Sequence, residues 1–455
     1  MPSTRFDLIV RGGAVVTAAG IGLADIGVAG GRIVALEPEL AGAAAAEIDA
    51  AGLHVLPGVV DAHMHINEPG RTEWEGWVTG TAALAAGGGT LCIDMPLNAH
   101  PPTLDAPSFD AKLAATAGSV TDFAFWGGLT PGNLDRLDEL AARGVVGFKA
   151  FMSRSGTDDF PHIDDGSLLF GMQAAKRLGL PVAVHAENDA ITSFLAARAV
   201  AEGRLSVRDY LASRPAIAET EAISRAILLA EEARCALHVV HVSTGRGVAL
   251  VAAGRARGVD VTCETCPHYL VFAEEDVEAL GVVAKCAPPI RDAAERAALW
   301  AALADGSIQT VASDHSPAPM TMKAGADFFQ IWGGISGCQS TLPALLNDGH
   351  HRRGLPLPRI AAVLADAPAR RFRLVGKGRI AVGCDADLAL VALRAEFTLA
   401  AADLLYRHAH SPYVGRTFMG RVARTIRRGE TIALDGRIVA STNGAFVHPE
   451  TATAV

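Results

Sequence analysis

Two histidines one residue apart, His63 and His65, give this sequence its clearest chemical signal. They follow an apolar run, residues 55–60, that has the composition of a buried strand. Side chains alternate across a strand, so both imidazoles project from one face and can bind one metal ion. An isolated pair of this kind is about as often a pair of ordinary loop histidines. Partners elsewhere in the chain therefore decide between the two interpretations.

Polar residues at the ends of other strand-like runs supply such partners. In a barrel of parallel strands the active site lies at the carboxyl ends of the strands, which gives weight to polar residues there. Several histidines at successive strand ends, together with the first pair, favour a metal centre over separate structural roles. His238 precedes His241 by three residues, so alternation predicts that it faces the barrel exterior or a helix. The candidates are Lys149, His185, His241, Asp314 and, more weakly, His315.

Lys149 ends the apolar run Val145–Phe148. An unpaired ammonium in such a run costs several kcal/mol in lost hydration. One interpretation is a lysine with a buried stem whose charged head reaches water. The other is a neutral amine that captures carbon dioxide and becomes a carbamate, whose two anionic oxygens can bridge two cations.

Asp314 follows the strand-like residues 310–313, where a carboxylate can ligate a metal and accept a proton from metal-bound water. Two cations that share the carbamate and a water would lower the pKa of that water from about 15.7 to about 7. The resulting hydroxide predicts hydrolysis of an unactivated carbonyl. Histidine and oxygen ligands suit zinc, which we expect, and also manganese, cobalt or iron. Side-chain alternation turns His315 away from Asp314, so we expect His315 to contact the residues around the metal ligands and not the metal itself.

The elements that must position these residues alternate between short apolar runs and longer helix-period stretches from Val55 to about Ala369. This pattern predicts an α/β fold, and eight strand candidates match a (β/α)8 TIM barrel. Two helices, Asp164–Leu178 and Thr220–Ala236, have amphipathic spacing. The strand candidates are Val55–Ala62, Thr90–Met95, Asp122–Gly128, Val145–Phe148, Pro181–His185, Leu237–His241, Asp260–Thr262 and Thr310–Ala312.

Both ends of the chain have the pattern of short strands. Neither end has enough apolar length to bury a core alone, so we expect them to form one small β-sandwich domain together. The predicted division is residues 1–54 and 370–455 for the β-sandwich and 55–369 for the barrel, with Ala41–Ala46 as a connector. The predicted strands are Phe6–Val10, Gly13–Thr17, Ala24–Val28, Gly31–Leu36, Ala386–Val391, Val422–Ile426 and Thr431–Leu434.

Composition excludes several classes of function. The 455 residues are 50% hydrophobic and 20% charged with a formal net charge of -9, which favours an ordinary globular protein and argues against a nucleic-acid partner. No early segment resembles an export signal or a membrane anchor, so we expect no membrane partner. Seven scattered cysteines do not form a disulfide framework and fit the cytoplasm. Cys263 and Cys266 have C-x-x-C spacing but no second such pair, so we interpret them as structural.

Three motifs together resemble the amidohydrolase superfamily in its cyclic amidase branch, which includes dihydroorotases, hydantoinases or dihydropyrimidinases, and allantoinases. They are residues 57–65 (PGVVDAHMH), the single strand-end Lys149, and residues 313–317 (SDHSP). The resemblance implies two divalent metal ions, a carboxylated Lys149, a homotetramer or dimer, and Asp314 as general base and then proton donor. The ligands that it implies are His63, His65, Lys149, His185, His241 and Asp314.

Within the branch, several segments are most similar to allantoinases. The resemblance implies a small cyclic amide substrate, allantoin, opened to allantoate. It also implies ring recognition by backbone groups at Ala287 and Gly333, and we expect Asn98 to offer an amide partner. The similar segments are residues 67–71 and 74–76, 95–98, 263–269, 284–291, 332–335 and 411–416.

Differences between this sequence and those of dihydroorotases and hydantoinases narrow the range of expected substrates. Asn67 stands where a dihydroorotase has an arginine for the carboxylate of its substrate, although Arg71 and Arg154 lie near enough in sequence to substitute. Residues 150–154 (AFMSR) lack the tyrosine that a hydantoinase presents to the oxyanion, so stabilisation falls mainly to the cations. A hydantoinase or dihydropyrimidinase remains the nearest alternative, and a non-catalytic scaffold a more distant one.

Overall fold

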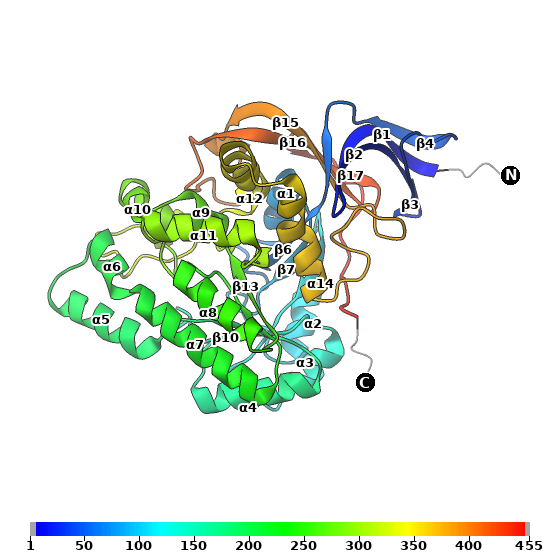
Figure 1. Cartoon of the computed structure of the whole chain (residues 1–455). Coiled ribbons are helices and arrows are strands. Elements are labelled where there is room, and N and C mark those ends of the chain that lie inside the picture. The colour runs from blue at the N-terminus through cyan, green and yellow to red at the C-terminus, as the bar shows by residue number, and fades with distance from the viewer. Residues whose placement is uncertain (1–5, 451–455) are drawn as a thin grey trace.

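Strands from both ends of the chain form one sheet in the computed structural model, which describes residues 6–450 (Figure 1). The strand order is β18-β17-β16-β15-β5-β1-β2-β3, and β4 pairs with β1 in parallel. The prediction that the two ends build one β unit is therefore confirmed at the level of a shared sheet. The strands are β1 (Phe6–Thr17), β2 (Gly20–Ala29), β3 (Arg32–Glu37), β4 (Ala44–Asp49), β5 (His54–Pro57), β15 (Leu388–Thr398), β16 (Thr417–Arg427), β17 (Glu430–Leu434) and β18 (Arg437–Ile438).

Two predictions for the amino-terminal strands were wrong in detail. Phe6–Val10 and Gly13–Thr17 belong to the single strand β1, whose register against β2 shifts between Val10 and Gly13. Gly12 has φ 65° there, a left-handed conformation that glycine adopts without strain and that lets the strand bulge and continue. The expected connector Ala41–Ala46 overlaps β4, because pairing with β1 outweighs the low strand propensity of alanine.

A second set of strands is parallel throughout and runs through the body of the molecule. Its hydrogen-bonded sheets have the orders β6-β7-β8 and β14-β13-β12-β11-β10-β9. A parallel bridge between Met64 and His315 joins the first strand to the segment after the last, which gives a barrel-like arrangement. The strands are β6 (Val59–Met64), β7 (Gly89–Asp94), β8 (Asp122–Phe125), β9 (Gly127–Gly128), β10 (Phe148–Phe151), β11 (Val182–His185), β12 (Leu237–Val239), β13 (Val261–Thr265) and β14 (Thr310–Val311).

The predicted strand Val55–Ala62 is two strands that belong to different sheets. It breaks at Gly58, whose amide donates to the carbonyl of Asp387 at 2.9 Å, so β5 pairs with β15 in the terminal sheet while β6 begins the parallel set. A Cβ on Gly58 would lie 2.4 Å from Thr90, so the close approach of β7 requires glycine at this break.

The predicted strand Val145–Phe148 was placed too early. The structure has β10 at Phe148–Phe151, paired with Val182–His185 of β11. Lys149 is therefore an interior residue of its strand and not the residue that ends it. His185 does end β11, whereas His241 and Asp314 lie just beyond β12 and β14.

Helices follow the parallel strands and cover their outer side (Figure 1). Asp164 caps α4 by accepting a hydrogen bond from the amide of Ser167, which fixes the predicted start of this helix. The other predicted helix begins earlier than expected, directly after Pro215. The α-helices are α1 (Trp77–Ala86), α2 (Ala106–Ala114), α3 (Leu137–Arg143), α4 (Asp165–Arg177), α5 (Asp189–Ala201), α6 (Val207–Ser213), α7 (Ala216–Ala233), α8 (Gly245–Ala256), α9 (Pro267–Val271), α10 (Glu274–Leu280), α11 (Ala293–Asp305), α12 (Thr341–Ala344), α13 (Leu357–Ala361) and α14 (Ala367–Arg371).

Shorter turns complete the body of the molecule. Lys323 of η2 donates hydrogen bonds to the segment that lines the cavity described below. The 3-10 turns are η1 (Gly281–Ala284), η2 (Met320–Lys323), η3 (Cys338–Ser340) and η6 (Ala401–Asp403), and the π-helical turns are η4 (Leu345–His351) and η5 (Ala362–Asp366).

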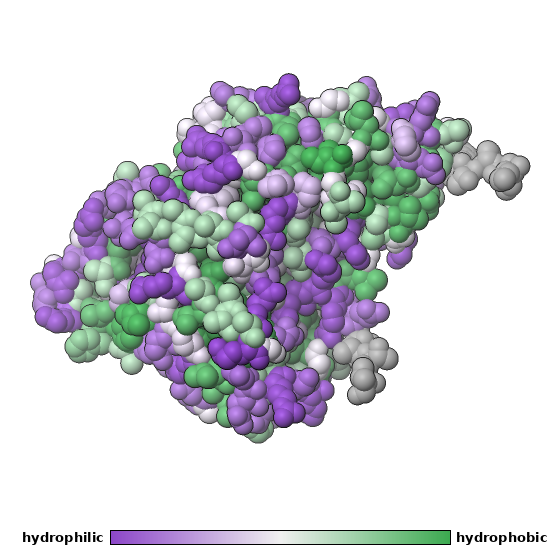
Figure 2. All heavy atoms as spheres, in the orientation of Figure 1, coloured by the Kyte–Doolittle hydropathy of each residue, from purple (hydrophilic) through white to green (hydrophobic). Residues whose placement is uncertain are grey.

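The surface mixes hydrophilic and hydrophobic side chains, with green side chains gathered over the β1–β3 end of the terminal sheet (Figure 2). Exposed hydrophobic residues of β2 and β3 include Ile21, Leu23 and Val34. Within residues 6–450, the helices are too short or too polar to cross a lipid bilayer.

A buried ionic cluster joins the two sheets. The ammonium of Lys377 lies 2.7 Å from Asp122 at the start of β8, and 2.8 Å from both Asp385 and Asp387, which precede β15. These carboxylates raise the pKa of Lys377 despite its burial. Three acidic side chains that could otherwise hold a metal are thus occupied by a lysine.

Candidate metal centre

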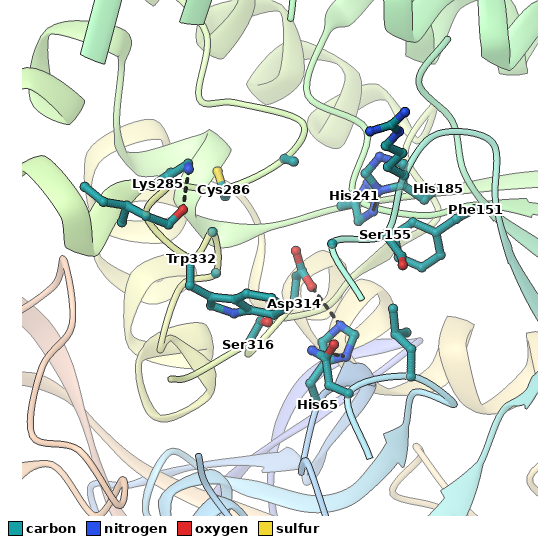
Figure 3. Close-up of a pocket in the computed structure, with 18 of the residues that line it drawn as sticks. His65, Phe151, Ser155, His185, His241, Lys285, Cys286, Asp314, Ser316 and Trp332 are labelled. Carbon is teal, nitrogen blue, oxygen red and sulfur yellow. Dashed lines mark hydrogen bonds and ion pairs between the residues drawn. The ribbon is translucent and has the colours of Figure 1, made fainter. Parts of the chain in front are cut away.

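The residues predicted as metal ligands come together at one cavity of about 330 Å³ (Figure 3). His63, His65, His185, His241 and Asp314 line it directly. Lys149 is fully buried, and its Nζ lies 4.9 Å from the ring centre of Phe151, which stacks on His185. The structure therefore brings all six predicted residues into one neighbourhood, with Lys149 behind the cavity wall.

The two histidines at the end of β6 and directly after it face Asp314. The Nε2 atoms of His63 and His65 lie 3.2 Å and 3.5 Å from the same carboxylate oxygen, Oδ1 of Asp314. Ligand atoms of these three residues all lie within 4.8 Å of one another. They form the first half of a candidate metal centre.

The second half is formed by His185 and His241. Nδ1 of His185 lies 3.0 Å from Nε2 of His241. The ring of His241 is also 5.4 Å from that of His63, measured between centroids, so the two halves adjoin. In Figure 3, His241 and His185 lie together near Phe151, across the cavity from Trp332 and Cys286.

Two buried glutamates that sequence reasoning missed orient these histidines. Glu264 accepts a hydrogen bond from Nδ1 of His63 at 2.8 Å, and Glu187 accepts one from Nε2 of His185 at 2.9 Å. A carboxylate that takes the ring N–H leaves the other nitrogen with its lone pair, and in both rings that nitrogen faces the cavity. A signal existed, because Glu187 lies two residues beyond His185 and Glu264 lies inside the C-x-x-C segment.

His238 also lies beside Glu264, which corrects the expectation that it faces a helix or the exterior. Its Nε2 is 3.6 Å from Oε2 of Glu264, and its Nδ1 is 2.8 Å from the hydroxyl of Thr262. Alternation failed because β12 ends at Val239, so His238 and His241 do not share one strand. His315 does turn away from Asp314, toward Glu75 at 3.6 Å.

Several residues at or near this site have strained backbone conformations. His241 and Asp314 have φ values of 39° and 45°, and Asn67 and Asn98 have 64° and 68°. Such left-handed conformations cost about 1–3 kcal/mol each in residues other than glycine and cluster at functional sites. They redirect His241 and Asp314 after their strands have ended, which strand alternation cannot predict.

The electrostatics of the cluster suit cations. Burial lowers the pKa of Lys149 to about 7, and its Nζ has no hydrogen-bond partner among residues 6–450. Burial also lowers the pKa of His65, His185 and His241. Burial alone would raise the pKa of Asp314, but the neighbouring His63 and His65 hold it well below its usual range.

At neutral pH this cluster therefore combines neutral imidazoles at His65, His185 and His241 with the Asp314 carboxylate and an amine that is readily deprotonated. Neutral histidine nitrogens and carboxylate oxygens are donors that divalent cations such as zinc prefer. The buried, unpartnered Nζ of Lys149 is the atom at which a further anionic ligand is needed. The residues present fit a centre for two divalent cations.

The predicted substrate residues line the same cavity, namely Asn98, Ala287 and Gly333. Nδ2 of Asn98 lies 3.4 Å from Nδ1 of His65, so this amide reaches the metal-facing histidines. Arg71 is committed elsewhere, because it donates to the carbonyl of Asn98 at 3.1 Å and pairs with Asp159 at 2.9 Å. Of the two arginines considered for an anionic ring, only Arg154 lines the cavity.

Known proteins resemble this chain over nearly its whole length. Residues 54–432 match the family described as the amidohydrolase family. The chain is 62% identical to the allantoinase of Rubrobacter xylanophilus over 98% of both chains. It is 54% identical to the allantoinase of Deinococcus radiodurans, over 97% of this chain and 99% of that one. The solved L-hydantoinase (dihydropyrimidinase) of Arthrobacter aurescens has a TM-score of 0.95 and 35% identity, covering 97% of this chain and 100% of that one.

Proposed function

The chain belongs to the amidohydrolase family, and from this premise we propose that it hydrolyses the cyclic amide of allantoin to allantoate. Allantoin is proposed as the substrate because the chain is similar to allantoinases along nearly its entire length. The complete set of histidine, lysine and aspartate donors around one cavity supports hydrolysis as the reaction class. The chain is accordingly an enzyme, a cyclic amidohydrolase.

Two divalent cations are the cofactors that we propose. His63, His65 and Asp314 would hold one, and His185 and His241 the other. A carbamate formed from Lys149 and carbon dioxide would supply the missing anionic oxygens, and the lowered pKa of this lysine supports it because only the neutral amine reacts. Bound cations supply an acidified water and a polarised carbonyl. Zinc is the expected metal, while manganese, cobalt and iron accept the same donors.

Asp314 is the residue that we propose as general base and acid. Its side chain is 13% exposed, whereas those of His63 and His65 are 2% and 6% exposed, so its carboxylate is the most accessible of the three groups. The depressed pKa keeps it ionised and able to accept a proton from the attacking water. The same oxygen then returns the proton to the leaving amide nitrogen.

A neutral ring suits the remaining lining. Asn98 offers a side-chain amide, and the backbone at Ala287 and Gly333 offers hydrogen-bonding groups that do not depend on side-chain identity. Phe151 follows Lys149 in β10, stacks on His185 with an interplanar angle of 13° and has no hydroxyl to donate. Bound cations would then supply most of the stabilisation of the developing oxyanion.

The nearest alternative is a hydantoinase or dihydropyrimidinase, which the close similarity to a solved hydantoinase structure favours. A substrate panel tests it: purified protein loaded with zinc is given allantoin, hydantoin, dihydrouracil and dihydroorotate. We expect the highest kcat/KM with allantoin. The proposal would be overturned if the protein opened hydantoin or dihydrouracil but left allantoin intact. Activity toward none of the four substrates would favour the non-catalytic scaffold.

The architecture, oligomeric state and location of the protein are also proposed from the family. We propose that the parallel strands from β6 onward form a closed (β/α)8 barrel within residues 55–369, and that the described parts of residues 1–54 and 370–455 form a β-sandwich domain together with β5. We further propose a homotetramer or dimer in the cytoplasm. All seven cysteines are buried and free, which supports a reducing compartment.

A further inference from the structure

One wall of the cavity is a continuous segment, residues 328–334. Six consecutive members of it, Phe329 to Gly334, line the cavity. The segment has no regular secondary structure, so its shape depends on contacts with its neighbours. Two buried lysines, Lys285 and Lys323, supply these contacts.

Lys285 binds the first half of the segment. Its Nζ donates to the carbonyls of Phe328 at 2.6 Å, of Phe329 at 3.3 Å, and of Ile331. In Figure 3 a dashed line joins Lys285 to a carbonyl oxygen of this wall. The ammonium also lies 4.6 Å from the ring centre of Tyr210, a favourable cation–π distance.

Lys323 binds the second half, on both sides of Gly333. Its Nζ donates to the carbonyl of Gly334 at 2.7 Å and to that of Trp332 at 3.3 Å. The amide of Gly334 donates to the carbonyl of Lys285 at 2.7 Å, and that of Trp332 to Met322 at 2.9 Å. Within residues 6–450, the amide and carbonyl of Gly333 itself have no partner.

We propose that Lys323, assisted by Lys285, is a positioning residue for substrate binding, which holds the peptide groups of Gly333 toward the ring of the substrate. The inference rests on the proposed function, in which Gly333 binds the ring through its backbone. Because the neighbouring carbonyls are fixed, the free peptide groups of Gly333 reach the cavity already oriented.

Folding stability alone does not explain these two lysines. Neither has a carboxylate within 4.0 Å among the described residues, and burial lowers the pKa of Lys285 to about 7 and that of Lys323 to about 8. Burial of a charge without a counter-ion costs free energy that an apolar side chain of equal length would not. The hydrogen bonds indicate what offsets this cost: the two lysines hold residues 328–334 in one position.

Lys323→Met tests the proposal, because methionine keeps the length of the stem and removes the ammonium. We expect KM for allantoin to rise about ten- to 100-fold, since a hydrogen bond to a charged group is lost beside the binding peptide. The value of kcat should change little, as expected for an interaction that the ground state and transition state share. The free energy of unfolding should stay equal or rise.

Two further variants sharpen the result. Lys323→Gln retains an N–H₂ donor and should give a KM between those of wild type and Lys323→Met. Met320→Ala alters an exposed side chain of the same turn and serves as the matched control with an unchanged KM. A purely structural role would instead lower the folded fraction and kcat together while KM stays unchanged, and that pattern would overturn the proposal.

A measurement without substrate separates this proposal from the proposed function. Trp332 packs edge-on against Trp74 with centroids 4.8 Å apart, so its fluorescence reports the position of the segment. Acrylamide quenching of Trp332, taken as the difference from Trp332→Phe in each background, should increase in Lys323→Met. Unchanged quenching would refute the positioning role even if allantoin is the substrate. Increased quenching in a protein that leaves allantoin intact would refute only the substrate.

Discussion

Lys149 and Lys377 are both buried lysines, 0% and 4% exposed, yet their surroundings are opposite. Lys377 meets three aspartates, and its pKa is raised. Lys149 has no hydrogen-bond partner among residues 6–450, and burial lowers its pKa to about 7. The same residue type is thus an internal counter-ion where two sheets meet and, beside the cavity, an amine without a hydrogen-bond partner among the described residues. The difference teaches that burial alone does not distinguish the two lysines, whereas the charged groups that surround each ammonium do.

Lys149→Ala should give the largest effect. Loss of the proposed carbamate removes a ligand of both cations, so we expect metal content to fall and kcat/KM to drop by at least about 10³-fold. The free energy of unfolding should also fall, by about 2–5 kcal/mol, because truncation of this fully buried side chain leaves a cavity. Metal analysis, kinetics and denaturant titration measure these outcomes. Added acetate or propionate should restore part of the activity, and full activity without it would exclude the carbamate.

Metal removal tests the same lysine without mutation. Chelation should abolish hydrolysis, and zinc added back in carbon-dioxide-free buffer should restore little of it. Bicarbonate should then complete the recovery, because the neutral amine of Lys149 reacts with carbon dioxide to form the ligand. The control is zinc with bicarbonate added to Lys149→Ala, which should stay inactive. Full recovery of the wild type without bicarbonate would contradict a carbamate.

Lys377→Met should lower the free energy of unfolding but leave the activity of the folded enzyme unchanged. It leaves Asp122, Asp385 and Asp387 facing one another without their shared cation, and breaking such a buried pair costs about 3–5 kcal/mol. We expect the free energy of unfolding to fall by this amount while KM of the folded enzyme stays the same. Denaturant titration measures the free energy of unfolding, and kinetics of the folded enzyme measure KM. Adding Asp387→Asn should recover part of the stability, and a change in KM would argue against the separation of the two regions.

Glu264→Gln should have the smallest effect of the four. Glutamine has nearly the same shape but no charge, so Nδ1 of His63 loses its charged acceptor and the ring its fixed tautomer. We expect zinc affinity to fall about 10- to 100-fold. Activity should recover at high zinc concentration, which kinetics against free zinc would show. Unchanged affinity would mean that Glu264 does not orient His63.

Some features of the site were open to prediction from local patterns. The ends of β6 and β11 place His63, His65 and His185, because alternation and an apolar run are properties of a few adjacent residues. Similarity to allantoinases and a shared terminal sheet confirmed the family and the joining of the two ends. The metal ligands and their roles stay predictions.

Other features depended on tertiary packing. Strand β5 joins the terminal sheet because Gly58 breaks the run, and Lys149 lies inside β10 because that strand takes its register from β11. His241 and Asp314 adopt left-handed backbone conformations beyond their strands. None of these follows from the periodicity of side chains, which holds only within one regular element.

The sequence by itself determined which donor atoms exist and that most of them follow apolar strands. Only the tertiary structure decided which of them meet: Glu264 binds His63 across 201 residues of chain, and Asp122 pairs with Lys377 across 255. The physical reason is that strand alternation acts over a few residues, whereas the partner of a buried charge is set by how distant strands pack. That packing left Lys149 alone and surrounded Lys377 with carboxylates.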